Sequence, residues 1–98
     1  MNRVHFALAL AIVLSTAVLA RAVVHNPLDA DTMKVALHTA KPEEDGFIEY
    51  VLARVDAGTL PLEMVQSTFL WAKKKPRQKF QYFKFGLTKR AEDAGIAL

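Results

Sequence analysis

The sequence predicts an all-helical protein in which a small three-helix module, residues 43–98, follows an apolar N-terminal segment. Three observations predict this fold class. Apolar residues recur at helical spacing in three successive segments after residue 42, as on the buried face of an amphipathic helix. Proline and glycine separate these segments, at positions typical of helix starts and ends. The 98 residues include no cysteine, so the fold depends on apolar packing without disulfide bonds.

The first helix is expected over approximately residues 43–57. Pro42 suits the first turn, and the three acidic residues that follow it complement the positive end of the helix dipole. Gly58 is placed to end the helix in the left-handed conformation. The predicted buried face consists of Phe47, Ile48, Val51, Leu52 and Val55.

The second helix is expected over approximately residues 60–74. Thr59 is the predicted N-cap and Pro61 lies in the first turn. Three lysines, residues 73–75, are placed in the last turn, where positive charge favours the negative end of the dipole. Pro76 then disfavours helix and forces a corner. The predicted buried stripe consists of Leu62, Val65, Phe69 and Ala72.

The third helix is expected over approximately residues 77–94, with Gly95 and Ile96 forming a Schellman ending. Its first part, residues 80–85, is also rich in strand-forming residues, so a strand is the alternative there. The apolar spacing continues past residue 85 and favours the helix. The predicted buried stripe consists of Phe80, Phe83, Leu87, Ala91 and Ala94.

The first 22 residues have the layout of a secretory signal peptide. The amino terminus and Arg3 precede an uninterrupted apolar run of fifteen residues, 6–20. Small-residue cleavage patterns end at Ala20 and Ala22. The run is shorter than the roughly 20 residues of a membrane-spanning helix. We therefore expect export to the periplasm or the cell exterior; the alternatives are a short signal-anchor in the cytoplasmic membrane and an N-terminal helix of a cytosolic protein.

Residues 23–42 are expected to form a linker or arm that can include one turn of helix. Two prolines bound the segment, which carries several polar and charged residues. Its central part, residues 32–40, fits a short helix or a strand, and the periodicity does not decide between them.

Charge is strongly segregated along the chain. Removal of residues 1–22 takes away two arginines and no acid, so the net charge falls from +3 to +1. Residues 29–63 contain eight acids and three bases, whereas residues 73–90 contain eight bases and no acid. Such charge asymmetry along a chain indicates the properties of its surfaces and not its fold. We predict a basic, aromatic binding surface formed by Lys73, Lys74, Lys75, Arg77, Lys79, Tyr82, Phe85 and Lys89.

The aromatic part of this surface has two interpretations. Tyr82 and Phe85 fall on the side of the third helix opposite its buried stripe. They either pack against the arm of residues 23–42 or form an exposed patch that binds a partner.

Basic residues interleaved with aromatic ones also suit nucleic acid, and a basic third helix is typical of helix-turn-helix proteins. An exported protein does not meet the genome, however. The expected partners are therefore an anionic membrane surface, an envelope polymer or an acidic protein. Two alternatives stay open. One is a cytosolic, helix-turn-helix-like nucleic-acid binder. The other is a purely structural protein in which the acidic first helix and basic third helix neutralise each other, within one chain or across a homodimer.

No pattern in the chain indicates an enzyme. The histidines, His5, His25 and His38, lack the spacing of a metal site, which needs three or four converging ligands. Ser67 is the only serine outside the signal segment, and no neighbouring pattern marks it as a nucleophile. We expect no catalytic residues, no metal and no cofactor.

Residues 58–91 contain a pattern made of Leu-Pro at a helix start, Phe-x-Trp-Ala, Lys-Pro-Arg, Tyr-Phe and a closing Leu. This pattern resembles one in short uncharacterised proteins of Planctomycetes-type bacteria and covers about a third of the chain. The resemblance implies a bacterial origin and a small helical module. It assigns no functional residues.

Overall fold

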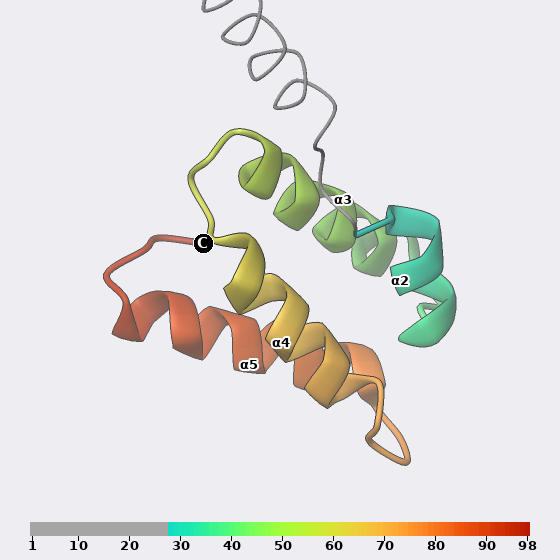
Figure 1. The fold of residues 1–98 in the computed structure, drawn as a ribbon. Helices are drawn as coiled ribbons and strands as arrows, with labels where there is room; N and C mark the ends of the chain where they lie inside the picture. The colour runs from blue at the N-terminus through green and yellow to red at the C-terminus, as the bar shows by residue number, and fades with distance from the viewer. Residues whose placement is uncertain (1–27) are drawn as a thin grey trace, which may run out of the picture.

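The computed structural model describes residues 28–98, and this part of the chain contains four helices and no strand (Figure 1). The predicted all-helical class is confirmed, and the alternative of a strand at residues 80–85 is wrong. The predicted signal segment, residues 1–22, and residues 23–27 of the arm lie outside the described residues. The helices are α2 (Ala30–Ala36), α3 (Pro42–Asp56), α4 (Leu62–Ala72) and α5 (Lys79–Asp93).

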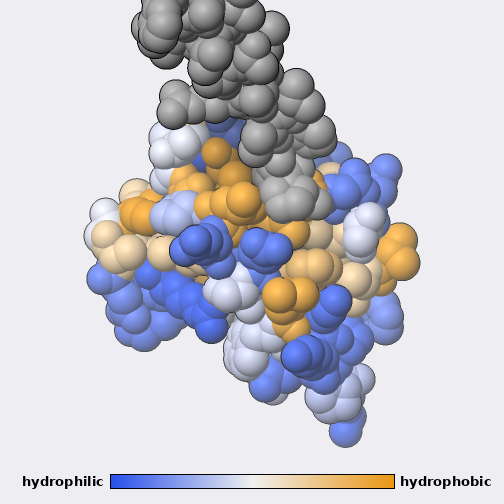
Figure 2. Space-filling model, in the orientation of Figure 1, coloured by the Kyte–Doolittle hydropathy of each residue, from blue (hydrophilic) through white to orange (hydrophobic). Residues whose placement is uncertain are grey.

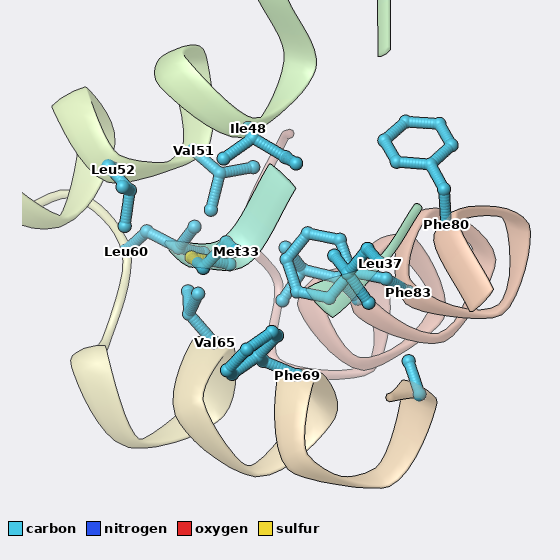
Figure 3. Packing of buried hydrophobic residues seen from close by; sticks show 12 residues of the cluster. Met33, Leu37, Ile48, Val51, Leu52, Leu60, Val65, Phe69, Phe80 and Phe83 are labelled. Atoms are coloured by element: carbon cyan, nitrogen blue, oxygen red, sulfur yellow. The ribbon is translucent and has the colours of Figure 1, made fainter. Parts of the chain in front are cut away.

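The four helices form two pairs around one apolar core. Helix α2 packs on α3, and α4 packs on α5; Figure 1 shows the two pairs as two layers. Edge-to-face ring contacts join the layers, with the Phe47 centroid 5.8 Å from that of Phe80 and 6.2 Å from that of Phe83. Every helix contributes to the core (Figure 3), which includes Met33, Leu37, Ile48, Val51, Leu60, Val65, Phe69, Phe83 and Leu87.

Helix α2 lies in the segment that the sequence left as a linker or arm. Its N-cap is Asp29, whose carboxylate accepts a hydrogen bond of 2.9 Å from the backbone N–H of Thr32. Met33 and Leu37 are fully buried at 0% and 1% exposure. The prediction of a module with three helices is therefore incomplete, because a fourth helix before residue 43 supplies Met33 and its C-cap residue supplies Leu37 to the core.

Three helices end in Schellman motifs, and one of them lacks glycine. Gly58 and Gly95 take positive φ angles of 77° and 75°, and the predicted ending at Ile96 is confirmed by its N–H, which donates to the carbonyl of Ala91 at 2.8 Å. At the end of α2 the same position is occupied by His38 with φ 55°. A side chain in the left-handed region is strained, so His38 is a weak point of the fold.

The start of α4 corrects the sequence prediction. The N-cap is Pro61 rather than Thr59, and no side chain caps the helix. The Thr59 hydroxyl is already engaged: it accepts from Arg54 Nε at 2.6 Å and donates to the Arg54 carbonyl at 3.1 Å. At the other end, α4 stops at Ala72, so residues 73–75 belong to the loop and not, as predicted, to the last helical turn.

Candidate functional site

The predicted surface residues lie on the α4–α5 loop, residues 73–78, and on α5. The loop projects from the body of the molecule (Figure 1), and Figure 2 shows mainly hydrophilic residues at that end. We define the basic aromatic surface as the eight residues predicted from the sequence together with Trp71, which the prediction did not include. The structure sorts seven of these nine residues into three groups with different surroundings, and Lys73 and Phe85 lie outside the groups.

Trp71, Lys75 and Tyr82 form one compact cluster. The rings of Trp71 and Tyr82 meet edge to face, with centroids 5.6 Å apart and an interplanar angle of 89°. The Lys75 ammonium lies 4.6 Å from the Trp71 centroid and 5.0 Å from the Tyr82 centroid, within the range of a cation–π interaction. The rings remain 39% and 41% exposed. The cluster thus presents a positive charge and two partly exposed aromatic rings together.

Gly86 allows Trp71 to lie against α5. A Cβ atom at this position would lie only 2.8 Å from Cζ3 of the Trp71 ring and 3.4 Å from the Thr68 methyl group. Further along the same pair of helices, Arg90 Nη1 donates to Thr68 Oγ1 at 2.8 Å and to Ser67 Oγ at 2.9 Å. Gly86 thus leaves room for the indole against α5, and Arg90 links α5 to α4 further along the same pair of helices.

Two other basic residues of the surface are held by the protein itself. The Lys79 ammonium donates to the carbonyl of Lys73 at 2.8 Å and also to that of Lys75, so it neutralises the end of α4. The Lys89 ammonium lies 3.0 Å from the Asp93 carboxylate, and this hydrogen bond raises the pKa of Lys89. Both ammonium groups therefore have partners within the protein, and neither is fully available to a binding partner.

Lys74 and Arg77 form the third group. Both side chains are exposed, and no ion pair involves either of them among residues 28–98. Arg77 also lines a surface hollow of about 220 Å³ together with Pro76, Gln78 and Tyr82. Lys73 is intermediate, because its ammonium lies 5.6 Å from the Phe69 ring centroid while the residue is exposed.

Phe85 extends the surface along α5. It is 70% exposed and lies three residues, nearly one helical turn, after Tyr82. The alternative prediction placed Tyr82 and Phe85 against the arm of residues 23–42. The described part of that arm forms α2, which packs on α3 instead, so both aromatic residues stay at the surface.

The contacts between the acidic α3 and the basic α5 bear on the structural alternative. Across residues 28–98, no ion pair joins the two helices. Their polar link is a 3.4 Å hydrogen bond from Gln81 to Glu44, and Lys84 lies 5.7 Å from the Phe47 ring centroid. The intrachain form of the structural alternative therefore has no support from these contacts.

Outside this surface, a hollow of about 420 Å³ lies on α2, lined by Asp31, Thr32, Val35 and Ala36. No three His, Cys, Asp or Glu side chains gather between residues 28 and 98 to hold a metal ion. In the same part of the chain, no helix has the length and apolar character needed to cross a bilayer. Comparison with known proteins finds no matching family model, no matching curated protein and no matching solved structure.

Proposed function

We propose that this protein is an exported, non-catalytic binding module that attaches to an anionic component of the bacterial cell envelope through its basic aromatic surface. The observation that carries the proposal is the pair of exposed cations on the projecting loop, Lys74 and Arg77. Neither has an acidic partner within residues 28–98, and the sequence contains no acid from residue 64 to residue 91.

Unpaired cations concentrated on one surface attract an anionic partner more than they stabilise the fold. Exposed charges contribute little to stability, but a cluster of one sign produces a local potential that draws oppositely charged ligands. The rest of the chain is acidic: after residue 22, ten acids and only three bases lie outside residues 73–90, and the net charge of the whole is +1. Attraction to an anionic partner would therefore be local to the α4–α5 loop.

The layout of residues 1–22 supports the envelope as the location, because it is typical of an exported protein. Intact mass measured on fractionated cells tests this part of the proposal. We expect a protein lacking residues 1–20 or 1–22 in the periplasmic or extracellular fraction. A full-length, soluble cytosolic protein would contradict it and would bring the nucleic-acid alternative forward.

Binding to two anionic probes tests the role of the surface. The double variant Lys74→Gln/Arg77→Gln should bind phosphatidylglycerol-containing vesicles and soluble dextran sulfate more weakly than the wild type does. Each charge near an anionic membrane contributes about 1 kcal/mol, so we expect roughly a 30-fold loss on the vesicles. Raising the salt concentration should weaken wild-type binding to both probes and reduce the difference in affinity between the wild type and the double variant.

A matched control separates local from overall charge. Lys41 is exposed and lies at the start of the acidic α3. Lys41→Gln lowers the net charge by the same amount as Lys74→Gln alone, yet it should leave binding to both probes within about twofold, against about fivefold for Lys74→Gln on the vesicles. Equal losses from the two single variants would show that only net charge matters and would refute a defined binding surface.

A further inference from the structure

We infer that the anionic partner is the headgroup layer of a lipid bilayer, and that Trp71, Tyr82 and Phe85 enter this layer when the surface binds. The inference rests on the proposed function and narrows its partner from anionic envelope components in general to anionic lipid. Four features of the described residues carry it.

The first feature is the exposure of Phe85. A phenylalanine that is 70% exposed has an apolar surface that water solvates poorly. Attraction to a soluble, highly charged polymer would leave that surface in water. The boundary between headgroups and acyl chains would remove it from water, while the neighbouring cations stay among the phosphates.

The second feature is that the Lys75 ammonium lies beside the rings of Trp71 and Tyr82, so that charge and rings would reach the same depth of a bilayer. The Lys75 ammonium is within 5.0 Å of both ring centroids in the Trp71–Tyr82 cluster. Tryptophan and tyrosine favour the interfacial region, where an apolar ring meets a wet, polar layer. Lipid phosphates occupy that same layer, so Lys75 would meet a phosphate without leaving the two rings.

The third feature is the surface hollow beside Tyr82. It is lined by Arg77, Pro76 and Gln78 as well as by the tyrosine, and its volume is about 220 Å³. A guanidinium at the rim of such a hollow suits a phosphate, with which arginine forms paired hydrogen bonds. This places a headgroup phosphate next to the rings that enter the bilayer.

The fourth feature is the position of the nearest acid along α5. Lys89, one helical turn beyond Phe85, is paired with Asp93 at 3.0 Å and therefore adds little attraction. Between the start of the α4–α5 loop and Phe85 there is no acid that an anionic surface would repel. The acid that reaches this part of α5 from another helix is Glu44, which accepts a hydrogen bond of 3.4 Å from Gln81, so the uninterrupted positive charge lies on the loop side of the rings.

The chain contains a single tryptophan, Trp71, so its fluorescence reports directly on the proposed contact. The protein is used as it is recovered from cells. On adding vesicles of phosphatidylglycerol and phosphatidylethanolamine, we expect the Trp71 emission to shift to shorter wavelength. Lipids brominated in the upper acyl chain should quench it. Phosphatidylcholine vesicles and dextran sulfate should produce neither change.

Two exposed apolar residues form the matched pair of variants. Phe85→Ser should lower affinity for the anionic vesicles about tenfold or more, because the variant loses the apolar side chain that leaves water on binding. Val35→Ser removes an apolar side chain of similar exposure, 76%, from α2, and should leave affinity within about twofold. Far-ultraviolet circular dichroism shows whether each variant is folded.

The outcomes separate the inference from the proposed function. If Trp71 emission stays unchanged on anionic vesicles while Lys74→Gln/Arg77→Gln still weakens binding to both probes, the surface binds anions and the lipid inference is wrong. If Phe85→Ser and Val35→Ser reduce vesicle affinity equally, the inference is also wrong. If neither the charge variant nor Phe85→Ser changes any binding, both the inference and the proposed function fail.

Discussion

The α2–α3 pair and the α4–α5 pair use their charged residues in different ways. In the α2–α3 pair, Lys34 binds Glu49 at 3.0 Å, and Asp45 accepts a hydrogen bond of 2.6 Å from the Thr39 hydroxyl. Glu44 accepts from two backbone N–H groups before α3. In the α4–α5 pair, the loop carries Lys74 and Arg77 without any acidic partner in the described part of the chain.

These charged side chains of the α2–α3 pair have partners within the protein, whereas two cations of the α4–α5 pair have no acidic partner among residues 28–98. Polar groups of the α2–α3 pair cap helices and tie the two helices together, so they contribute to the fold. The exposed cations of the α4–α5 loop contribute little to stability, and the proposed function assigns them to a partner. The fold of the α4–α5 pair depends on apolar packing, on the close approach at Gly86 and on the hydrogen bonds from Arg90 to Ser67 and Thr68.

The largest expected effect comes from truncating the α2 contribution to the core. Met33→Ala should lower the free energy of unfolding by about 2–5 kcal/mol, because Met33 is fully buried. Val35→Ala, two residues away and 76% exposed, should change it by less than about 0.5 kcal/mol. Urea unfolding followed by circular dichroism measures both. Equal, small effects would mean that α2 is a dispensable arm.

The two helical glycines sharpen the comparison between the pairs. Gly46→Ala on α3 should stabilise the protein by up to about 1 kcal/mol, since a Cβ there meets nothing within 4 Å. Gly86→Ala gains the same helix propensity but forces the Trp71 ring to move from its place. We expect the Gly86 variant to be less stable than the Gly46 variant by roughly 1–3 kcal/mol.

Trp71 emission gives a second measurement for this glycine pair. Gly86→Ala should change the emission of the free protein, because the indole is displaced, and Gly46→Ala should not. If Gly86→Ala is as stable as Gly46→Ala and its emission is unchanged, then α4 and α5 do not approach as closely as the structure indicates.

A smaller effect is expected at the end of α2. His38→Gly should raise the free energy of unfolding by about 0.5–1 kcal/mol, because glycine adopts the φ of 55° without strain. His38→Ala is the control, since alanine keeps the left-handed strain and should bring no such gain. Thermal unfolding of the three proteins tests this, and a destabilised glycine variant would show that the histidine side chain contributes more than its backbone strain costs.

The smallest effect is a pH dependence at the N-cap of α2. The hydrogen bond from the Thr32 backbone N–H lowers the pKa of Asp29 below its ordinary value of 3.8. A carboxyl with a lowered pKa stabilises the folded state above pH 3.8, and this contribution is lost as the pH falls through the folded-state pKa.

The variant Asp29→Ser isolates this contribution, because serine caps a helix without titrating. Between pH 5 and about pH 2, the melting temperature of the wild type should fall slightly more than that of Asp29→Ser. Parallel curves would show that the carboxylate at Asp29 makes no titrating contribution to the cap.

The sequence predicted most of the buried faces of three helices but not the α2 helix; Ala94, which was placed in the buried stripe of the third helix, is exposed. Ile48, Val51 and Phe83 follow a helical period over several turns, and proline and glycine mark the ends of their segments. Helix α2 places only Met33 and Leu37 in the core. Two apolar residues four positions apart are too few to distinguish a short helix from a strand.

The sequence showed which residues of the surface are basic or aromatic. It did not show which of the basic side chains the protein itself binds. Lys74 and Lys79 belong to the same basic stretch, yet Lys79 binds the carbonyls at the end of α4 while Lys74 is exposed. Only the path of the loop decides this. Trp71 could have been added from its spacing, because Trp71 and Lys75 lie four residues apart. The contact with Gly86 depends on how α4 and α5 align, which no local pattern specifies.

One measurement tests most directly whether stability and binding reside in different pairs of helices. The melting temperature and the affinity for phosphatidylglycerol-containing vesicles are measured for Lys34→Gln and for Lys74→Gln/Arg77→Gln. We predict that Lys34→Gln lowers the melting temperature and leaves affinity unchanged, whereas the double variant loses affinity at an unchanged melting temperature. If each variant changed both quantities to a similar extent, the separation of stabilising charges from binding charges would be contradicted.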